Sequence, residues 1–98
     1  MEEPQYYIKE NSWIAKIAAK KLRCDSVAIV IGKTIHLHNS SKENFLNNKR
    51  WLKHELCHVE QYRRYGKINF IARYLWESVL KGYHNNRFEV EARRAEEL

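Results

Sequence analysis

The chain has 98 residues, which is enough for a single domain (residues 1–98) with one modest hydrophobic core. Hydrophobic residues make up 44% of it and aromatic residues 12%, so the composition excludes a disordered chain, and the longest apolar runs are too short to cross a bilayer. The net charge of +6 favours acidic partners, among them nucleic acid.

The N-terminal half of the sequence predicts a helix followed by a β-hairpin. Ser12 is a suitable N-cap for a helix that runs to about Arg23, because apolar residues recur there at helical spacing. The β-branched segments VAIVI (27–31) and TIHLH (34–38) flank the dipeptide GK, which is typical of a two-residue turn.

Side chains of the second strand alternate between two faces. Ile35 and Leu37 point to one face, whereas Thr34, His36 and His38 point to the other, where we expect the histidines to be exposed. The polar run NSSKEN (39–44) predicts a loop.

The C-terminal half predicts three helices. The first covers residues 47–65, with Gly66 as its C-terminal cap. The second, residues 68–81, is apolar almost all round, which predicts that it is the central support of the core. After a break at KGYHNNR, a last helix begins near Arg87 and runs to the end. The expected fold class is α+β, a small and mostly helical domain with a β-hairpin beside the helix at 47–65.

That helix carries the motif HELCH at residues 54–58. His54 and His58 are one turn apart and project from the same face, as two ligands of one metal ion must. Glu55 lies about 100° further round the helix, where it can reach a metal-activated water without binding the ion. Chance gives roughly 0.03 such motifs at this composition, so the surroundings must support the assignment.

The surroundings of the motif place Glu55 within an apolar helix face and the two histidines at the edge of that face. Lys53, Glu60 and Arg64 lie opposite and are expected to meet water. A carboxylate in an apolar face is costly unless it has a partner, and a metal-activated water is such a partner. Glu55 is therefore the candidate general base. The apolar face consists of Trp51, Leu52, Leu56, Val59 and Tyr62.

A catalytic zinc site has three protein ligands, and the motif supplies only two. The metzincin pattern requires a glycine at position 61 and a histidine at position 64, whereas this chain has Gln61 and Arg64, so that class is excluded. The remaining candidates are the other histidines and the acidic residues of the last helix: His36, His38, His84, Glu89, Glu91, Glu96 and Glu97.

HELCH, followed about thirty residues later by FEVEA, resembles the gluzincin metallopeptidases. The small size is similar to the minimal gluzincin domains called minigluzincins, and the resemblance covers roughly residues 27–95. It implies one Zn²⁺ ion per chain, held by His54, His58 and Glu89 of the EVEA segment, with Glu55 as the base. It also implies that extended substrate pairs with the strand beside the active-site helix, for which the segment TIHLHN (34–39) is the candidate.

One position departs from the gluzincin pattern. Many relatives have Asp or Asn after the alanine of this segment, whereas the chain has Arg93, so a side chain that orients a ligand is missing or comes from elsewhere. The resemblance also implies an oxyanion-stabilising donor near the metal, for which Tyr83 and His84 are candidates. The alternative is a tyrosine packed in the core and a histidine in a loop.

Helical periodicity partly favours Glu91 over Glu89 as the third ligand. Glu91 lies nearer the middle of the side that Phe88, Ala92 and Ala95 mark as buried. The two carboxylates are about 200° apart on a helix, so they cannot share the role. Because a ligand belongs at the border between core and cleft, and because the resemblance selects Glu89, we predict Glu89.

Cysteine usage and the N-terminus bear on location. Cys24 and Cys57 are too few for a disulfide scaffold and match no zinc-binding spacing, so they are interpreted as buried or half-buried thiols. The segment MEEPQYYIKE lacks the basic-then-apolar pattern of a secretory signal. We therefore expect a soluble, cytoplasmic protein.

Together these features predict a zinc metallopeptidase that hydrolyses peptide bonds in a peptide or protein substrate. The alternative is a non-catalytic metal- or partner-binding domain of the same zincin-like fold. A basic nucleic-acid-binding module is a third and less favoured hypothesis, because no aromatic-basic recognition motif accompanies the charge. The basic clusters are Lys16, Lys20, Lys21 and Arg23; Lys49, Arg50 and Lys53; and Arg63, Arg64 and Lys67.

Overall fold

Five helices and one three-stranded sheet make up residues 5–98, the part of the chain that the computed structural model describes; residues 1–4 of the acidic N-terminal segment lie outside it. The predicted α+β class is confirmed. In chain order the elements are β1 (Tyr7–Lys9), α1 (Trp13–Leu22), β2 (Val27–Ile31), β3 (Thr34–His38), α2 (Lys42–Asn47), α3 (Lys49–Tyr65), α4 (Lys67–Asn85) and α5 (Arg87–Ala95).

The sheet has the strand order β1-β3-β2. The predicted hairpin is confirmed, because β2 and β3 pair antiparallel and Gly32 in the turn has a φ of 64°. β1 pairs parallel with β3, and this short strand was not predicted from the sequence. β3 is therefore central, and β2 is an edge strand within the described residues.

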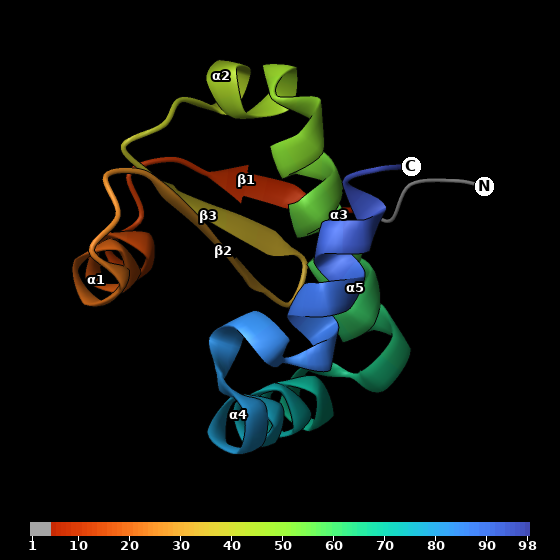
Figure 1. Ribbon diagram of the computed structural model, residues 1–98. Coiled ribbons are helices and arrows are strands. Elements are labelled where there is room, and N and C mark those ends of the chain that lie inside the picture. Colours follow the sequence, from red (N-terminus) through yellow and green to blue (C-terminus); the bar gives the residue numbers. More distant parts are fainter. Residues whose placement is uncertain (1–4) are drawn as a thin grey trace.

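The sheet lies between α1 on one face and α3 on the other (Figure 1). Ile35 and Leu37 are fully buried toward α3, as their alternation predicts. His36 faces α1, where its Nδ1 lies 2.8 Å from the Oγ of Ser12, the N-cap residue of that helix. The histidine face of β3 is thus half-buried beneath α1, not exposed.

The segment 39–44, expected to be a loop, contains the start of α2. Ser41 caps this helix by accepting a hydrogen bond from the backbone N–H of Asn44 at 3.0 Å. Phe45 is fully buried and packs edge-on against Trp51, at 5.0 Å between ring centroids. One large apolar side chain in a polar run therefore anchors a helix that local composition does not predict.

α3 has a buried stripe of apolar side chains, as the helical spacing of these residues predicts. Asn48 caps its start by accepting from the backbone N–H of Trp51, and Gly66, with a φ of 84°, ends it. The apolar side chains at the centre of the stripe pack against the sheet and α5. The buried residues of α3 are Leu52, Glu55, Leu56, His58, Val59, Gln61 and Tyr62.

The prediction that residues 68–81 form the central support of the core is wrong. α4 lies at the periphery, against α3 and α5 (Figure 1), and Phe70 is its only buried residue. Tyr74 and Ile71 are half-buried against the core, whereas most of the other large apolar side chains are exposed. The reason is that α1 and α3 already cover the two sheet faces, so one side of α4 meets no other described element.

Candidate metal centre

Two imidazoles and one carboxylate converge where α3 meets α5. His54 Nε2 lies 3.1 Å from Glu89 Oε1, and His58 Nε2 lies 3.2 Å from Glu89 Oε2. Both Nε2 atoms therefore face the same carboxylate, and the ligand atoms of the three residues all lie within 4.8 Å of one another. Within residues 5–98 this is the group whose side chains could hold a metal ion.

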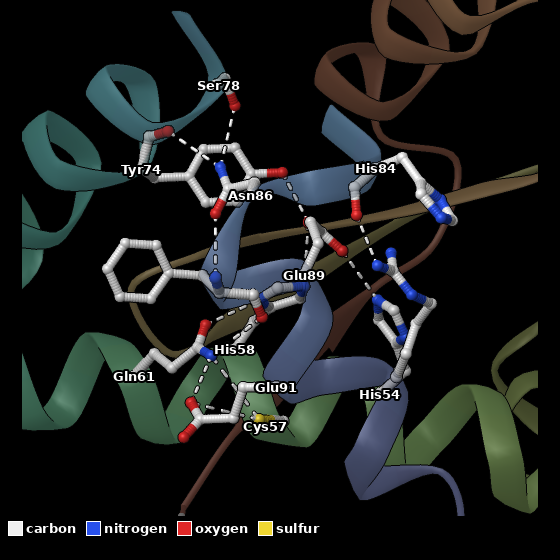
Figure 2. A network of polar contacts seen from close by, with 12 residues as sticks. His54, Cys57, His58, Gln61, Tyr74, Ser78, His84, Asn86, Glu89 and Glu91 are labelled. Carbon is white, nitrogen blue, oxygen red and sulfur yellow. Dashed lines mark hydrogen bonds and ion pairs between the residues drawn. The ribbon is translucent and has the colours of Figure 1, made fainter. Parts of the chain in front are cut away.

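Glu89 is held in this position by the junction between α4 and α5. Gly82 interrupts α4 with a φ of 80°, a backbone conformation that favours glycine. Asn86 is fully buried: its Nδ2 donates to the Tyr74 carbonyl oxygen at 3.0 Å and to Ser78 Oγ at 2.9 Å, and its Oδ1 accepts from the backbone N–H of Phe88. This cap fixes the start of α5 on α4, so Glu89 in its first turn points toward α3 (Figure 2).

Each imidazole is also held at its second nitrogen. His54 Nδ1 lies 2.6 Å from Glu96 Oε2, and His58 Nδ1 lies 2.8 Å from Gln61 Oε1. An acceptor at Nδ1 keeps the proton there and leaves the Nε2 lone pair for an ion. Arg93 stands where many gluzincins have an Asp or Asn that orients a ligand. Here the orienting carboxylate comes from Glu96, about two turns after Glu89. Arg93 instead donates to the His84 carbonyl oxygen.

Gln61 links the two helices that carry the ligands. It is fully buried, and its Nε2 donates to the Phe88 carbonyl oxygen at 3.1 Å and to Glu91 Oε1 at 2.6 Å (Figure 2). One amide therefore orients His58 on α3 and holds the first turn of α5. An orienting role was not predicted for either Gln61 or Glu96, although the i, i+3 spacing of His58 and Gln61 on one helix is a signal for such a contact.

Glu91 points away from the three ligand candidates. Its side chain is 46% exposed and lies 3.5 Å from Arg64, whereas the side chain of Glu89 is 5% exposed. The partial preference of periodicity for Glu91 is therefore not supported by the geometry, which groups Glu89 with the histidines.

Glu55 lies on the floor of the same site and is 6% exposed. Among the hydrogen bonds and ion pairs of residues 5–98, none involves its carboxylate, and no fully buried side-chain oxygen in this part of the chain lacks a partner, so the Glu55 oxygens are accessible from the cleft that the residue lines. Burial raises the pKa of Glu55 to about 7, and the neighbouring charges of His58 and His54 only partly oppose this rise. The result is a desolvated acid with a free carboxylate beside the candidate ligands.

The three ligand candidates carry complementary charge. Burial lowers the pKa of His54, but its hydrogen bond to Glu89 and the charge of Glu55 outweigh burial and raise the pKa to about 9. Burial raises the pKa of Glu89, but hydrogen bonds to His54, His58 and Tyr74 hold it well below its usual range. Tyr74 OH donates to Glu89 Oε2 at 2.5 Å. Glu89 is therefore an ionised carboxylate that favours positive charge at this point.

A cleft of about 320 Å³ opens onto the site. All five residues of β2 line it, together with apolar side chains of α1 and α4 and the acidic and imidazole groups just described. The expectation that substrate pairs with residues 34–39 is corrected here, because β1 and β2 occupy both edges of β3. The free edge beside the site belongs to β2.

Other candidates from the sequence lie elsewhere. His36, His38 and His84 are not among the three residues grouped at the site. Cys57 is half-buried and contacts Glu91, and burial followed by the charge of Glu91 raises the pKa of its thiol to about 12. Cys24 is exposed, so its predicted burial is wrong. Tyr83 lines the cleft, whereas Tyr74, which contacts Glu89, was missed because a tyrosine in an apolar helix gives no distinct signal.

The fold and the site define a small α+β domain with a candidate His-His-Glu metal centre. The family model described as the eCIS core domain matches residues 14–66, which is 53 of the 98 residues. The chain therefore belongs to the eCIS core domain family, a small domain of extracellular contractile injection systems. The matched segment includes α1, the hairpin, α2 and α3 with its HELCH motif, and it ends before α4 and Glu89.

Family membership suggests a structural or partner role in a complex and gives no support to a peptidase. The resemblance to gluzincins thus rests on the motif residues alone. No curated protein and no solved structure matches the chain significantly. Among residues 5–98, no helix combines the length and the hydropathy that a membrane crossing requires.

Proposed function

We propose that the chain binds one Zn²⁺ ion through His54, His58 and Glu89 and hydrolyses peptide bonds with Glu55 as general base. The observation that carries the proposal is the buried Glu55 carboxylate, which has no described hydrogen-bond partner and lines the cleft beside the ligand candidates. A carboxylate that lines a cleft and whose pKa burial raises to about 7 favours a function in proton transfer.

The donor set fits zinc. Two imidazoles and one carboxylate are the ligands of known catalytic zinc sites, which keep a further position open for water or substrate. The contacts of 3.1 and 3.2 Å between the Nε2 atoms and the Glu89 oxygens are close to the separation of about 3.4 Å between two donors of one tetrahedral ion. A bound zinc ion supplies Lewis acidity that polarises a carbonyl and makes a water molecule more acidic.

The residues of the chain supply the remaining requirements. A carboxylate whose pKa is raised to about 7 can accept a proton from the attacking water and deliver it to the leaving amine. Tyr83 lines the cleft, and burial, followed by the charge of Glu89, raises its pKa, so it keeps its proton and is available as a hydrogen-bond donor. The free edge of β2 can pair with an extended peptide through main-chain hydrogen bonds.

The test compares a Glu55→Gln variant with Glu60→Gln, a control variant at a more exposed position of the same helix. Glu55→Gln should retain zinc and lose hydrolysis of unfolded protein or a peptide library by at least ~100-fold, since general-base catalysis contributes about 10²–10⁴. Glu60→Gln should retain both properties. If Glu55→Gln loses its metal, the assignment of roles on α3 is wrong; if it keeps full activity, the mechanism is wrong.

A second candidate function is a non-catalytic metal- or partner-binding domain, and the comparisons favour it over the peptidase. The supporting observation is membership of the eCIS core domain family, whose description refers to an injection system. In this case the metal would add to the direct packing of α3 against α5.

The two candidates differ in a measurable way. Wild-type protein loaded with one zinc per chain is incubated with a diverse peptide library, and cleavage products are sought by mass spectrometry. Cleavage that disappears in Glu55→Gln supports the peptidase. No cleavage by zinc-loaded wild-type protein, together with a large fall in thermal stability on zinc removal, supports the non-catalytic domain.

A further inference from the structure

One side of α4 exposes a continuous row of large apolar side chains. Ile68 and Val79 are each 79% exposed, Trp76 is 63% exposed, and Leu80 and Leu75 are 59% and 58% exposed. These five residues are here called the α4 face; four of them lie at least about 120° round the helix from Phe70, its core residue, and Leu80 lies about 80° from it. No described element of the chain covers the α4 face.

The exposed area is too large for an ordinary monomer surface. From the fractional exposures and the usual sizes of these side chains, the α4 face presents roughly 700 Å² of mostly apolar surface. The largest apolar patch of a typical monomer is about 300–600 Å², whereas a stable protein–protein interface buries about 800 Å² on each partner. The α4 face is therefore close to one half of a standard interface.

The exposed apolar residues nearest the middle of α4 are placed symmetrically about the point between Leu75 and Trp76. Outward from the point between Leu75 and Trp76, apolar residues recur at equal distances on the two sides. In a twofold interface, residue i of one copy contacts residue j of the other and j contacts i, so positions at equal distances from the axis are paired. On the exposed side of α4, the matched positions are Leu75 with Trp76 and Ala72 with Val79.

The same residues form two adjacent ridges at intervals of four residues. One ridge contains Ile68, Trp76 and Leu80, and the other contains Leu75 and Val79. Ridges of this spacing pack into the grooves of an identical helix at a crossing angle of about 50°. The pattern therefore suits pairing with a second copy of α4.

We propose that the α4 face is the interface of a homodimer in which the α4 helices of two copies cross at Leu75 and Trp76 about a twofold axis. Each copy has a net charge of +6, so association works against electrostatic repulsion. Added salt screens this repulsion. The dimer should therefore tighten as ionic strength rises, in contrast to a complex with an acidic partner.

The first test is the mass of the full chain in solution, measured by sedimentation equilibrium. Wild type should have about twice the 11.9 kDa of one chain, and Trp76→Glu should have the mass of one chain. Trp13→Glu is the matched control, because Trp13 on α1 is 66% exposed but lies outside the α4 face, and it should remain dimeric. Circular dichroism confirms the fold of each variant, and Val79→Glu replaces Trp76→Glu if the latter does not fold.

Two results would overturn the proposal. Wild type with the mass of one chain at concentrations up to about 0.5 mM would mean that something other than a second copy covers the face. A dimer that Trp13→Glu disrupts and Trp76→Glu does not would place the interface on α1.

Cross-linking tests the geometry of the pairing. In a background of Cys24→Ser and Cys57→Ser, a short bis-maleimide should join two chains of Trp76→Cys, since position 76 lies next to the axis. The same reagent should not join two chains of Ile68→Cys, because the two copies of that position lie about 20 Å apart along antiparallel helices. Efficient cross-linking at position 68 and not at 76 would contradict the twofold pairing.

Discussion

Replacement of Glu89 by glutamine removes one negative charge from the centre of the candidate metal site and keeps the shape of the side chain. Glu89 is 4% exposed and contacts His54 Nε2, His58 Nε2 and Tyr74 OH at 3.1, 3.2 and 2.5 Å. Loss of an outer partner of a metal ligand costs about 10–100-fold in affinity, so loss of a charged ligand should lower zinc affinity by at least ~100-fold.

The same substitution should destabilise the metal-free protein. Hydrogen bonds to a charged group contribute about 1.5–3 kcal/mol each, and glutamine can replace some of them, so we expect a loss of about 2–3 kcal/mol in the free energy of unfolding. For a domain of this size, that corresponds to a melting temperature lower by ~10–20 °C.

Glu91→Gln is the matched control, two residues away on the same helix. Its side chain is 46% exposed, and glutamine still offers an acceptor to Gln61, so zinc affinity should change by less than about threefold and stability by less than ~1 kcal/mol. Competition with a chromophoric chelator measures the affinity, and thermal denaturation in EDTA measures the stability. If Glu91→Gln loses zinc and Glu89→Gln does not, the assignment of the third ligand is refuted.

Three further predictions concern the network, the metal and the charge. Gln61→Leu leaves His58 Nδ1 and the Phe88 carbonyl oxygen without their partner, so zinc affinity should fall by about 10–100-fold. An unchanged affinity in chelator competition would contradict the orienting role of Gln61. Removal of zinc should lower the melting temperature without unfolding the chain, since a ligand at 1,000 times its Kd stabilises the folded state by about 4 kcal/mol. An unchanged melting curve after confirmed zinc loss would be inconsistent with a metal that joins α3 to α5. Nucleic acid should bind only weakly, because Arg50, Arg63 and Arg64 already form ion pairs within the chain. Fluorescence anisotropy should show that this affinity falls steeply as salt is added. Tight, sequence-selective binding would reverse the ranking of functions.

Local geometry explains why the centre of the site could be predicted from the sequence. His54, Glu55 and His58 lie within five residues of one helix, so the period of the helix alone places the two histidines on one face and Glu55 beside them. The apolar residues of α3 show the same period, and Leu52 and Val59 are buried as expected. No long-range information is needed for this part of the site.

The other half of the site depends on contacts between helices. Periodicity within residues 87–98 partly favours Glu91, and Glu89 could be selected only by resemblance to known zinc sites. In the structure, the buried cap Asn86 and the hydroxyl of Tyr74 set the rotation of α5 and so bring Glu89 to the histidines. Glu96 reaches His54 through the same rotation, which no pattern within the last helix reveals.

The burial of a helix depends on its neighbours as well as on its own side chains. The apolar residues of α4 predict a central helix, but α1 and α3 already cover the sheet, and Trp76 and Val79 face outward. β1 escaped prediction for a related reason: its three residues pair with β3 from a position more than twenty residues earlier in the chain. Both errors concern which surfaces meet, a property of the whole fold.

The metal content of protein purified without added zinc tests the central claim most directly. Elemental analysis should find one zinc ion per chain in wild type and none in the double variant His54→Ala, His58→Ala. The control variant His36→Ala, His38→Ala should keep one ion, because neither residue belongs to the group at the site. Wild type that binds no zinc even when zinc is supplied, or a His54→Ala, His58→Ala variant that still holds one ion per chain, would contradict the assignment of the metal centre.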